Sequence, residues 1–195
     1  MKKFAALLGL AFALAFSLAL DAQQAASDGA RFTSGTNLAR PADYREWIFL
    51  ASGLGMTYDP ADAASPTRPQ NFTNVFVNPS SYRAFMQTGK WPDKTELVLE
   101  IRGSDSEASI NKAGRFQTQR VFALEIHVKD SRLPNGWGFF NFGADTRSAP
   151  PLSGDHVKSC VECHAKNAAV DTTFVQFYPT LIEVARQKGT MQPGF

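Results

Sequence analysis

The sequence lacks an excess of charge of either sign. Its 195 residues include 20 lysines and arginines against 18 aspartates and glutamates. Without residues 1–22 the balance is 18 against 17, because Lys2, Lys3 and Asp21 are removed. A protein that neutralises a nucleic-acid backbone needs a basic surface, so the near-neutral chain argues against nucleic-acid binding.

Long hydrophobic runs are also scarce, and the only one stands at the N-terminus. Lys2 and Lys3 precede an uncharged apolar stretch that ends before Asp21, and Ala22 is a small residue at which a signal peptidase could cut. This pattern predicts a secretory signal peptide over residues 1–22 and a periplasmic mature protein. The alternative is an uncleaved membrane anchor, although about 17 apolar residues are only just enough to span a bilayer.

The remainder of the chain has the size of one domain. No second apolar stretch of that length follows, so the mature protein is expected to be soluble, with no membrane span. Residues 23–39 are small and polar and are predicted to be a flexible leader. Residues 40–195 are then expected to form a single domain, and sixteen phenylalanines supply bulk for its core.

Hydrophobic periodicity and turn residues predict an α+β domain, mainly an antiparallel β-sheet with a few helices. Helices are predicted at 43–52, at 79–88 and within 171–189, the last kinked or broken at Pro179. Strands are predicted at 72–77, 95–102, 120–128 and 136–142, and loops at 58–70, 103–114 and 147–154.

Two of the predicted strands alternate in character. In the first, one face carries Leu97, Leu99 and Ile101, and the other carries Glu96, Val98, Glu100 and Arg102. In the second, Phe122, Leu124, Ile126 and Val128 share a face opposite Ala123, Glu125 and His127. The first strand is therefore expected to bury one face only.

Both cysteines of the chain lie in one stretch, "SCVECHAK" at residues 159–166, and His164 follows Cys163 directly. The pattern Cys-x-x-Cys-His is typical of a c-type haem attachment site. Two thiols on one helical turn can each add to one of the two vinyl groups of a haem, and the adjacent imidazole then lies under the iron. The sequence therefore predicts one haem c bound covalently through Cys160 and Cys163, with His164 as the metal ligand, just ahead of a C-terminal helix.

Other uses of the two thiols remain open. They could form a disulfide in an oxidising compartment. A thioredoxin-like redox site would follow a βαβ pattern, whereas a proline-rich loop precedes this motif. Zinc would need more ligands than the motif supplies, and only His127 and His156 remain as imidazoles. The signal peptide, the spacing and the trailing histidine together favour haem.

The sixth iron position separates electron carriers, which close it with Met or His, from ligand-binding haem proteins, which leave it open. The candidates to close it are Met56, Met86, Met191, His127 and His156. The methionines lie in a glycine-rich turn, on a short helix and in the C-terminal tail, and His156 is too close to the proximal side. His127, beside Glu125, has the better case, yet a structural role is expected for it. We therefore expect an open site.

With several further blocks, these residues make the chain resemble the cytochrome P-460 family, which includes the cytochromes c′-β. The blocks are "YREW" at 44–47, "VFVNPSSY" at 75–82, "PDKT" at 92–95, "LEIHVKDS" at 124–131, "GWGFFNF" at 136–142, "CVECHAKNA" at 160–168, Asp171, and "FVQFYP" at 174–179. The resemblance implies an antiparallel β-fold with a few helices, a homodimer, and a five-coordinate haem with His164 on the proximal side.

The resemblance also assigns distal residues. In hydroxylamine-oxidising members, a lysine four residues after the threonine of the "PDKT"-like turn bonds covalently to the haem ring. That position holds Leu99 here, and Lys90 and Lys94 fall in the turn, so the cross-link is expected to be absent. An arginine of those enzymes corresponds to Thr73, and a distal glutamate that moves protons corresponds to Glu125.

Three functions are compatible with these features. The favoured one is binding of nitric oxide or a similar small ligand at an open iron, beside a distal wall of Leu99 and of Phe72 or Phe76. The second is oxidation of hydroxylamine, with Glu125 accepting protons and electrons passing to a periplasmic redox partner. The third, simple electron transfer, would need a sixth ligand.

Overall fold

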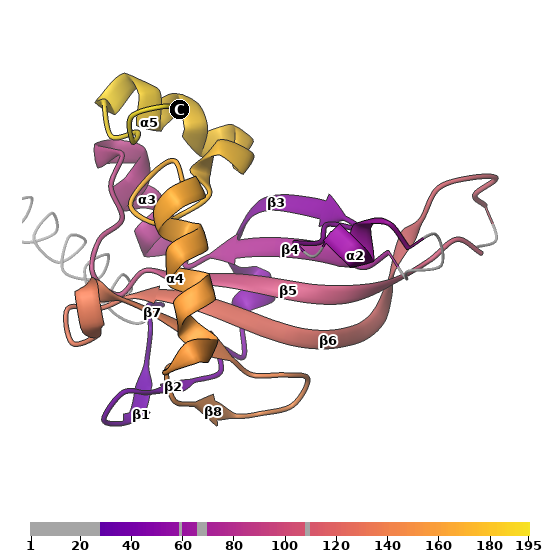
Figure 1. Cartoon of the computed structure of the whole chain (residues 1–195), viewed down its shortest axis with the longest axis horizontal. Coiled ribbons are helices and arrows are strands. Elements are labelled where there is room, and N and C mark those ends of the chain that lie inside the picture. Colours follow the sequence, from indigo (N-terminus) through magenta and orange to yellow (C-terminus); the bar gives the residue numbers. More distant parts are fainter. Residues whose placement is uncertain (1–27, 59, 66–69, 108–109) are drawn as a thin grey trace, which may run out of the picture.

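The computed structural model describes residues 28–195 except 59, 66–69 and 108–109, and the predicted signal peptide lies outside the described residues. The centre of the fold is a five-stranded antiparallel sheet in which each strand pairs with the next along the chain (Figure 1). Its strands are β3 (Ile48–Leu54), β4 (Phe72–Val77), β5 (Glu96–Asp105), β6 (Phe116–Lys129) and β7 (Trp137–Asn141). The predicted α+β class with a mainly antiparallel sheet is confirmed.

The strand at 72–77 was predicted with its observed bounds, whereas β5 and β6 extend beyond their predicted ends. Residues 103–105 and 116–119 were expected to lie in or beside a polar loop, but they continue the hairpin. Pairs such as Ser104 with Gln117 extend the ladder past two register shifts. The β5–β6 hairpin therefore projects from one end of the molecule (Figure 1).

A second, three-stranded sheet joins the first described residues to a short strand from the later part of the chain. It consists of β1 (Phe32–Ser34), β2 (Asn37–Ala39) and β8 (Ser148–Ala149), in the order β1-β2-β8. The prediction of a flexible leader is therefore wrong for residues 28–39. Leu38 is fully buried, and the Asp28 carboxylate accepts a hydrogen bond from the backbone N–H of Ser80 at 2.8 Å. The partners of these residues come from distant parts of the chain, so the local polar composition did not indicate them.

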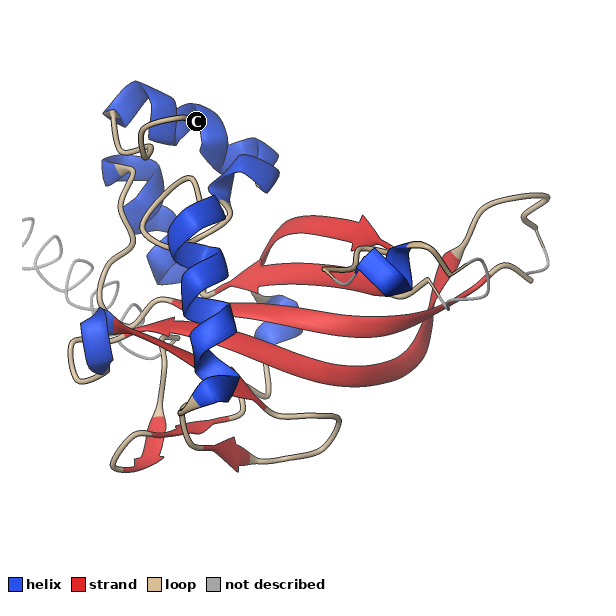
Figure 2. Cartoon of the chain, in the orientation of Figure 1, coloured by secondary structure: helices blue, strands red, loops and turns tan. Residues whose placement is uncertain are grey.

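The helices gather mainly at the other end of the sheet from the hairpin tip (Figure 2). They are α2 (Pro60–Ala63), within the predicted loop, α3 (Pro79–Thr88), α4 (Asp155–Asn167) and α5 (Pro179–Lys188), with 3₁₀ turns η1 (Tyr44–Glu46), η2 (Pro134–Gly136) and η3 (Val175–Phe177). Pro179 begins α5 rather than kinking a longer helix, because proline fits the first helical position, where its missing N–H is not needed. Within the described part of the chain, every helix is too short or too polar to cross a bilayer.

The predicted helix at 43–52 is not present. Asp43 makes no capping hydrogen bond through its side chain, and only the short turn η1 follows it. From Ile48 the chain is extended and pairs with β4, with a register shift between Phe49 and Ala51. Trp47, Ile48 and Phe49 are aromatic and β-branched residues that favour strands, and pairing with a neighbouring strand outweighed the capping pattern.

The strand register divides the sheet into two faces. Paired residues share a face, so the front face carries Val77, Leu97, Leu99, Glu125, His127 and Phe139. The rear face carries Phe76, Val98, Glu100, Leu124, Ile126 and Phe140. One end of the front face packs against α3 and α5, and the rear face packs against the N-terminal segment and β8. Both faces of the sheet are therefore covered over part of their area.

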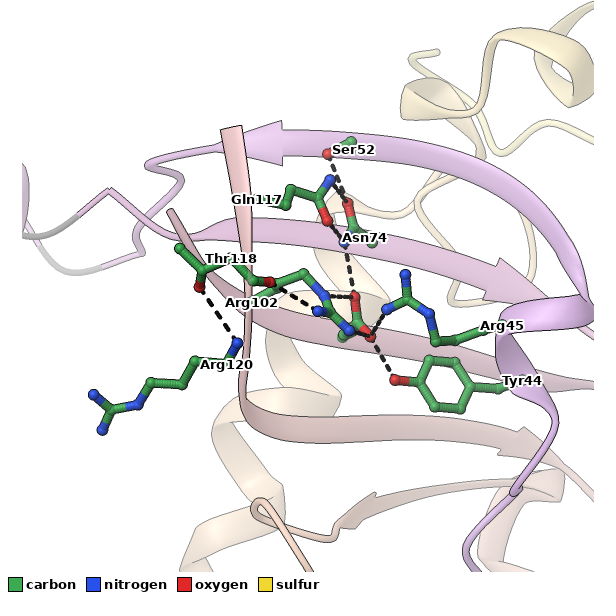
Figure 3. Close-up of polar contacts among 9 residues, drawn as sticks. Tyr44, Arg45, Ser52, Asn74, Arg102, Gln117, Thr118 and Arg120 are labelled. Atoms are coloured by element: carbon green, nitrogen blue, oxygen red, sulfur yellow. Dashed lines mark hydrogen bonds and ion pairs between the residues drawn. The ribbon is translucent and has the colours of Figure 1, made fainter. Parts of the chain in front are cut away.

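The rear face of β5 holds a buried group of charges that contradicts the prediction of one buried face. Glu100 is fully buried, and its carboxylate accepts hydrogen bonds from Tyr44, from Arg45 and Asn74 at 2.7 and 2.9 Å, and from two nitrogens of Arg102 at 2.7 and 2.8 Å (Figure 3). Burial alone would raise the pKa of Glu100, but the hydrogen bonds from Arg102, Tyr44 and Asn74 outweigh it and lower the pKa to about 2. Glu100 and Arg102 can be buried on β5 because each satisfies the other.

Candidate haem-binding site

The Cys-x-x-Cys-His motif lies on α4, which crosses the front of the five-stranded sheet (Figure 1). Asp155 in the first turn and Lys166 in the last complement the helix dipole and favour helix formation. Cys160 and Cys163 are one turn apart, and His164 is four residues after Cys160, so the three side chains are neighbours on one side of the helix. Both thiols are free, and every residue of α4 is at least partly exposed.

His164 is held in one tautomer by a backbone carbonyl. Its Nδ1 lies 2.7 Å from the carbonyl oxygen of Thr172. A carbonyl can only accept, so Nδ1 carries the proton and donates it, which leaves the lone pair of Nε2 free to bind a metal. Burial lowers the pKa of His164, with the Thr172 carbonyl opposing that effect, and the imidazole is therefore neutral at neutral pH. A neutral imidazole with a fixed second nitrogen is the form that ligates iron.

Aromatic rings pack around the imidazole of His164. Its centroid is 4.8 Å from that of Phe139, 4.4 Å from Phe174 and 4.9 Å from His127. His127 is buried and stacks on Phe139, with centroids 4.1 Å apart and planes 8° from parallel. Burial lowers the pKa of His127 well below its ordinary value, and a protonated His164 would lower it further, so His127 is an uncharged packing residue.

Residues that pair across neighbouring strands form rows on the front face. The row next to the one that contacts His164 brings two predicted distal residues together. Leu99 pairs directly with Glu125, two residues along the strands from the pair formed by Leu97 and His127. The two pairs are therefore about 7 Å apart along the strands. The Glu125 carboxyl is accessible to solvent, yet the protein atoms around it raise its pKa above the usual range. Leu99 and Glu125 therefore occupy the sheet just beyond the row that contacts His164.

The other predicted distal residues are divided between the two faces. Thr73 pairs with Ile101 and lies on the front face, one row beyond Leu99. Phe72 and Phe76 alternate with it and lie on the rear face, where Phe76 is buried with its ring centroid 5.6 Å from that of Tyr44. These two phenylalanines therefore do not line the face that α4 crosses.

The candidate sixth ligands are scattered. His127 lies beside His164 itself, His156 is on α4 one turn before Cys160, and Met86 is exposed on α3. Met191 packs against the core between α3, α5 and the sheet. Met56 is the one candidate on the far part of the front face, with its sulfur 3.9 Å from Thr73 Oγ1.

The competing uses of the cysteines gain no support from their surroundings. The two sulfurs form no disulfide. Among the described residues, no three His, Cys, Asp or Glu side chains are grouped closely enough to hold a metal ion, so a zinc site is not formed. The donor set instead fits haem c: two free thiols for the vinyl groups and an imidazole whose Nε2 is available for iron. Bound haem would supply a redox-active iron at which a small ligand can bind.

The sequence analysis assigned no role to three residues near the motif. Asp171 was named only as part of the family resemblance and Thr172 was not named, yet the two form the turn whose carbonyl contacts His164. Tyr58 follows β3, and although its side chain is largely exposed, nearby protein atoms raise its pKa and the charges of Glu125 and Cys163 raise it further. Tyr58 therefore lies near the Cys163 thiol and the Glu125 carboxyl.

A helix that carries two free thiols, with an oriented imidazole packed against one face of an antiparallel sheet, supplies the donors of a c-type haem-binding domain. Residues 41–175, which are most of the chain, match the sequence model of a protein family, Cytochrome P460. The chain therefore belongs to the cytochrome P460 family, as predicted, and is a c-type cytochrome with haem c as its cofactor. The search of curated proteins found no match.

Proposed function

We propose that this protein is an exported monohaem cytochrome of the P460 family that binds nitric oxide or a similar small neutral ligand at an open distal iron site. Cys160 and Cys163 hold the haem through thioethers, and His164 Nε2 is its proximal ligand. The observation that carries the proposal is the hydrogen bond from His164 Nδ1 to the Thr172 carbonyl, which orients the imidazole as an iron ligand. Export is supported by the signal-peptide pattern of residues 1–22.

The environment beyond His164 favours a neutral diatomic ligand. Leu99 presents a hydrocarbon surface there, and Val75 pairs with Leu99 in the same row of the front face. Bound dioxygen carries separated charge and needs a hydrogen-bond donor, whereas nitric oxide needs less polar help. The polar residues of this row are Glu125 and, next to it on β7, Asn141, whose Oδ1 accepts a hydrogen bond from the backbone N–H of Gly143. Lys94 pairs with Asp130 and lies over the ring of Phe32, which supports the absence of a lysine cross-link.

Titration of the reduced, haem-loaded protein with nitric oxide tests this proposal. We expect an ordinary c-type absorption spectrum before addition and a saturable spectral change that ends at one nitric oxide per haem. A spectrum of low-spin, six-coordinate iron before addition would contradict the open site, and Met56 would then be the residue to replace. A strongly displaced Soret band would instead indicate a cross-linked haem.

Hydroxylamine oxidation is the second candidate, and the raised pKa of the Glu125 carboxyl favours it. A carboxyl whose pKa is raised toward neutrality is suited to accept and release protons. Tyr58 lies close enough for its pKa to respond to the charge of Glu125. In this role Glu125 would accept substrate protons while electrons pass to a periplasmic acceptor.

The Glu125→Gln variant separates the two candidate functions when both hydroxylamine turnover and nitric oxide binding are measured. If the protein oxidises hydroxylamine, this variant loses at least about 100-fold in turnover, because a positioned proton acceptor contributes that much or more. If the protein binds nitric oxide, the variant keeps the wild-type stoichiometry and spectrum. Glu183→Gln, at an exposed carboxylate on α5, is the matched control and changes neither measurement.

The proposal also includes a homodimer and a periplasmic redox partner. The family's homodimer and a periplasmic redox partner are carried over on family membership, and the near-neutral charge of the mature chain supports a partner other than nucleic acid.

A further inference from the structure

The carbonyl that orients His164 belongs to a tight turn with an unusual backbone. Val170 and Thr173 form an isolated antiparallel bridge, with hydrogen bonds of 2.8 and 3.3 Å between their backbones. The two residues between them, Asp171 and Thr172, have φ angles of 45° and 62°. A two-residue turn with positive φ at both central positions normally takes Asn-Gly or Asp-Gly. A β-branched threonine at the second position is strained.

Side chains from two distant strands hold this turn in place. The Asp171 carboxylate accepts a hydrogen bond from Trp137 Nε1 at 3.2 Å and forms an ion pair with Lys129. Lys129 Nζ also lies 5.5 Å from the centre of the Trp137 ring, so the three residues form one compact group. Asp171 is thus tied to β6 by charge and to β7 by a hydrogen bond.

The other end of the turn is buried and anchored separately. Trp91 Nε1 donates to Thr173 Oγ1 at 2.8 Å, and this hydroxyl donates in turn to the carbonyl of Val170 at 2.6 Å. Trp91, Val170 and Thr173 are all at most 2% exposed. The Thr172 carbonyl therefore lies between two anchored residues, Asp171 and Thr173, and these contacts fix its direction independently of His164.

We propose that Asp171 is a positioning residue for the proximal histidine, which acts through the turn by holding the Thr172 carbonyl against His164 Nδ1–H. A strained turn relaxes unless surrounding contacts hold it, and Asp171 supplies two such contacts at the residue next to the carbonyl. This inference rests on the proposed ligation of haem iron by His164.

The orientation has a definite electronic consequence. When Nδ1 of a ligating imidazole donates a hydrogen bond, Nε2 becomes a stronger electron donor to the metal. Stronger donation strengthens the iron–histidine bond and stabilises ferric iron relative to ferrous iron, which lowers the reduction potential. Loosening the turn therefore weakens the iron–histidine bond and raises the reduction potential.

Resonance Raman spectroscopy and redox titration of the haem-loaded protein test the proposal. In Asp171→Ala we expect the iron–histidine stretching band to broaden and move to lower frequency, and the reduction potential to become more positive. In Asp171→Asn we expect most of the wild-type band to be retained, because asparagine tolerates positive φ and can still accept from Trp137. Lys129→Met, which keeps an apolar chain but removes the charge, should give a smaller shift in the same direction as Asp171→Ala.

The outcomes separate this inference from the proposed function. Glu183→Ala, which removes an exposed ion-paired carboxylate on α5, is the matched control and leaves both measurements unchanged. If the wild type shows an iron–histidine band and neither Asp171→Ala nor Lys129→Met alters it, the positioning role is overturned. Absence of that band from the wild-type ferrous protein overturns the ligation itself and with it the proposed function. If Asp171→Ala does not fold, Lys129→Met and Asp171→Asn decide the question.

Discussion

Replacing Glu100 with alanine is expected to lower the free energy of unfolding by about 3–5 kcal/mol, because removing one partner of a buried ion pair leaves the other charge unpaired. The carboxylate is fully buried on the rear face and accepts hydrogen bonds from Arg102, Tyr44 and Asn74. Arg102 is itself only 9% exposed, so water cannot replace the lost partner. A domain of this size is stable by about 5–15 kcal/mol. Urea unfolding at neutral pH measures the loss.

The control for this variant is an ion pair of the same type on the surface. Glu183 and Arg186 pair on α5 with both side chains more than half exposed, and Glu183→Ala should cost less than about 1 kcal/mol. If Glu100→Ala yields no folded protein, Glu100→Gln gives the measurable comparison. Equal unfolding midpoints for the Glu100 and Glu183 variants would show that the buried group does not stabilise the sheet.

Stability is expected to fall as the pH rises from 6.5 to 8, and Glu96 is the reason. Burial raises the pKa of Glu96 from 4.5 to about 8, with Arg31 opposing the shift and Asp43 adding to it. Within the described residues, no donor contacts Glu96 Oε1. Between the two pKa values the folded state retains a proton that the unfolded chain has lost, so folding becomes less favourable by about 1.4 kcal/mol per pH unit. Because half of the Glu96 carboxyl is ionised at pH 8, the loss relative to a variant that cannot ionise is about 1.6 kcal/mol between pH 6.5 and 8.

His127 and His164 act in the opposite direction over the lower part of this window. Their lowered pKa values make folding more favourable as the pH rises past the unfolded value of 6.5, at which half of the unfolded imidazoles are still protonated. Glu96→Gln cannot ionise, so its stability should not fall between pH 6.5 and 8 and should rise slightly through the histidines, while Glu183→Gln should follow the wild type. Parallel pH profiles of the wild type and Glu96→Gln would rule out a protonated Glu96 in the folded protein.

The features that sequence predicted well are local ones. The strand at 72–77 and the helix at 79–88 were predicted with their observed bounds, because the aromatic and β-branched residues of the strand, Pro79 at the first turn and Gly89 at the end are all encoded within a few residues. Gly89 adopts a φ of 69°, which glycine tolerates best. The spacing of Cys160, Cys163 and His164 is local in the same sense, so the motif and the family could be recognised from the sequence.

The features that sequence missed depend on contacts between distant segments. Phe76 and Leu99 both lie on predicted strands, but only the pairing of Phe76 with Val98 shows that they point to opposite faces. The burial of Glu100 depends on Tyr44 and Asn74, which come from other elements. The carbonyl that orients His164 belongs to Thr172, in a turn that holds its shape through Trp137 and Trp91. No periodicity in the chain carries this information.

The two faces of the sheet suggest a division of roles. The rear face contains the paired charges around Glu100 and a hydrophobic core, which together stabilise the strands. The front face presents Leu99 and Glu125 beyond the row that contacts His164. A stable sheet behind an accessible front face is compatible with the proposed binding of a small ligand at the iron.

The most direct test of this account is the mass of the intact protein after expression with a haem-attachment system and denaturation under reducing conditions. The account predicts that the polypeptide, without its signal peptide, carries the added mass of one haem, and that the haem is lost from a variant in which Cys160 and Cys163 are both serine. A wild-type mass equal to that of the polypeptide alone would contradict it.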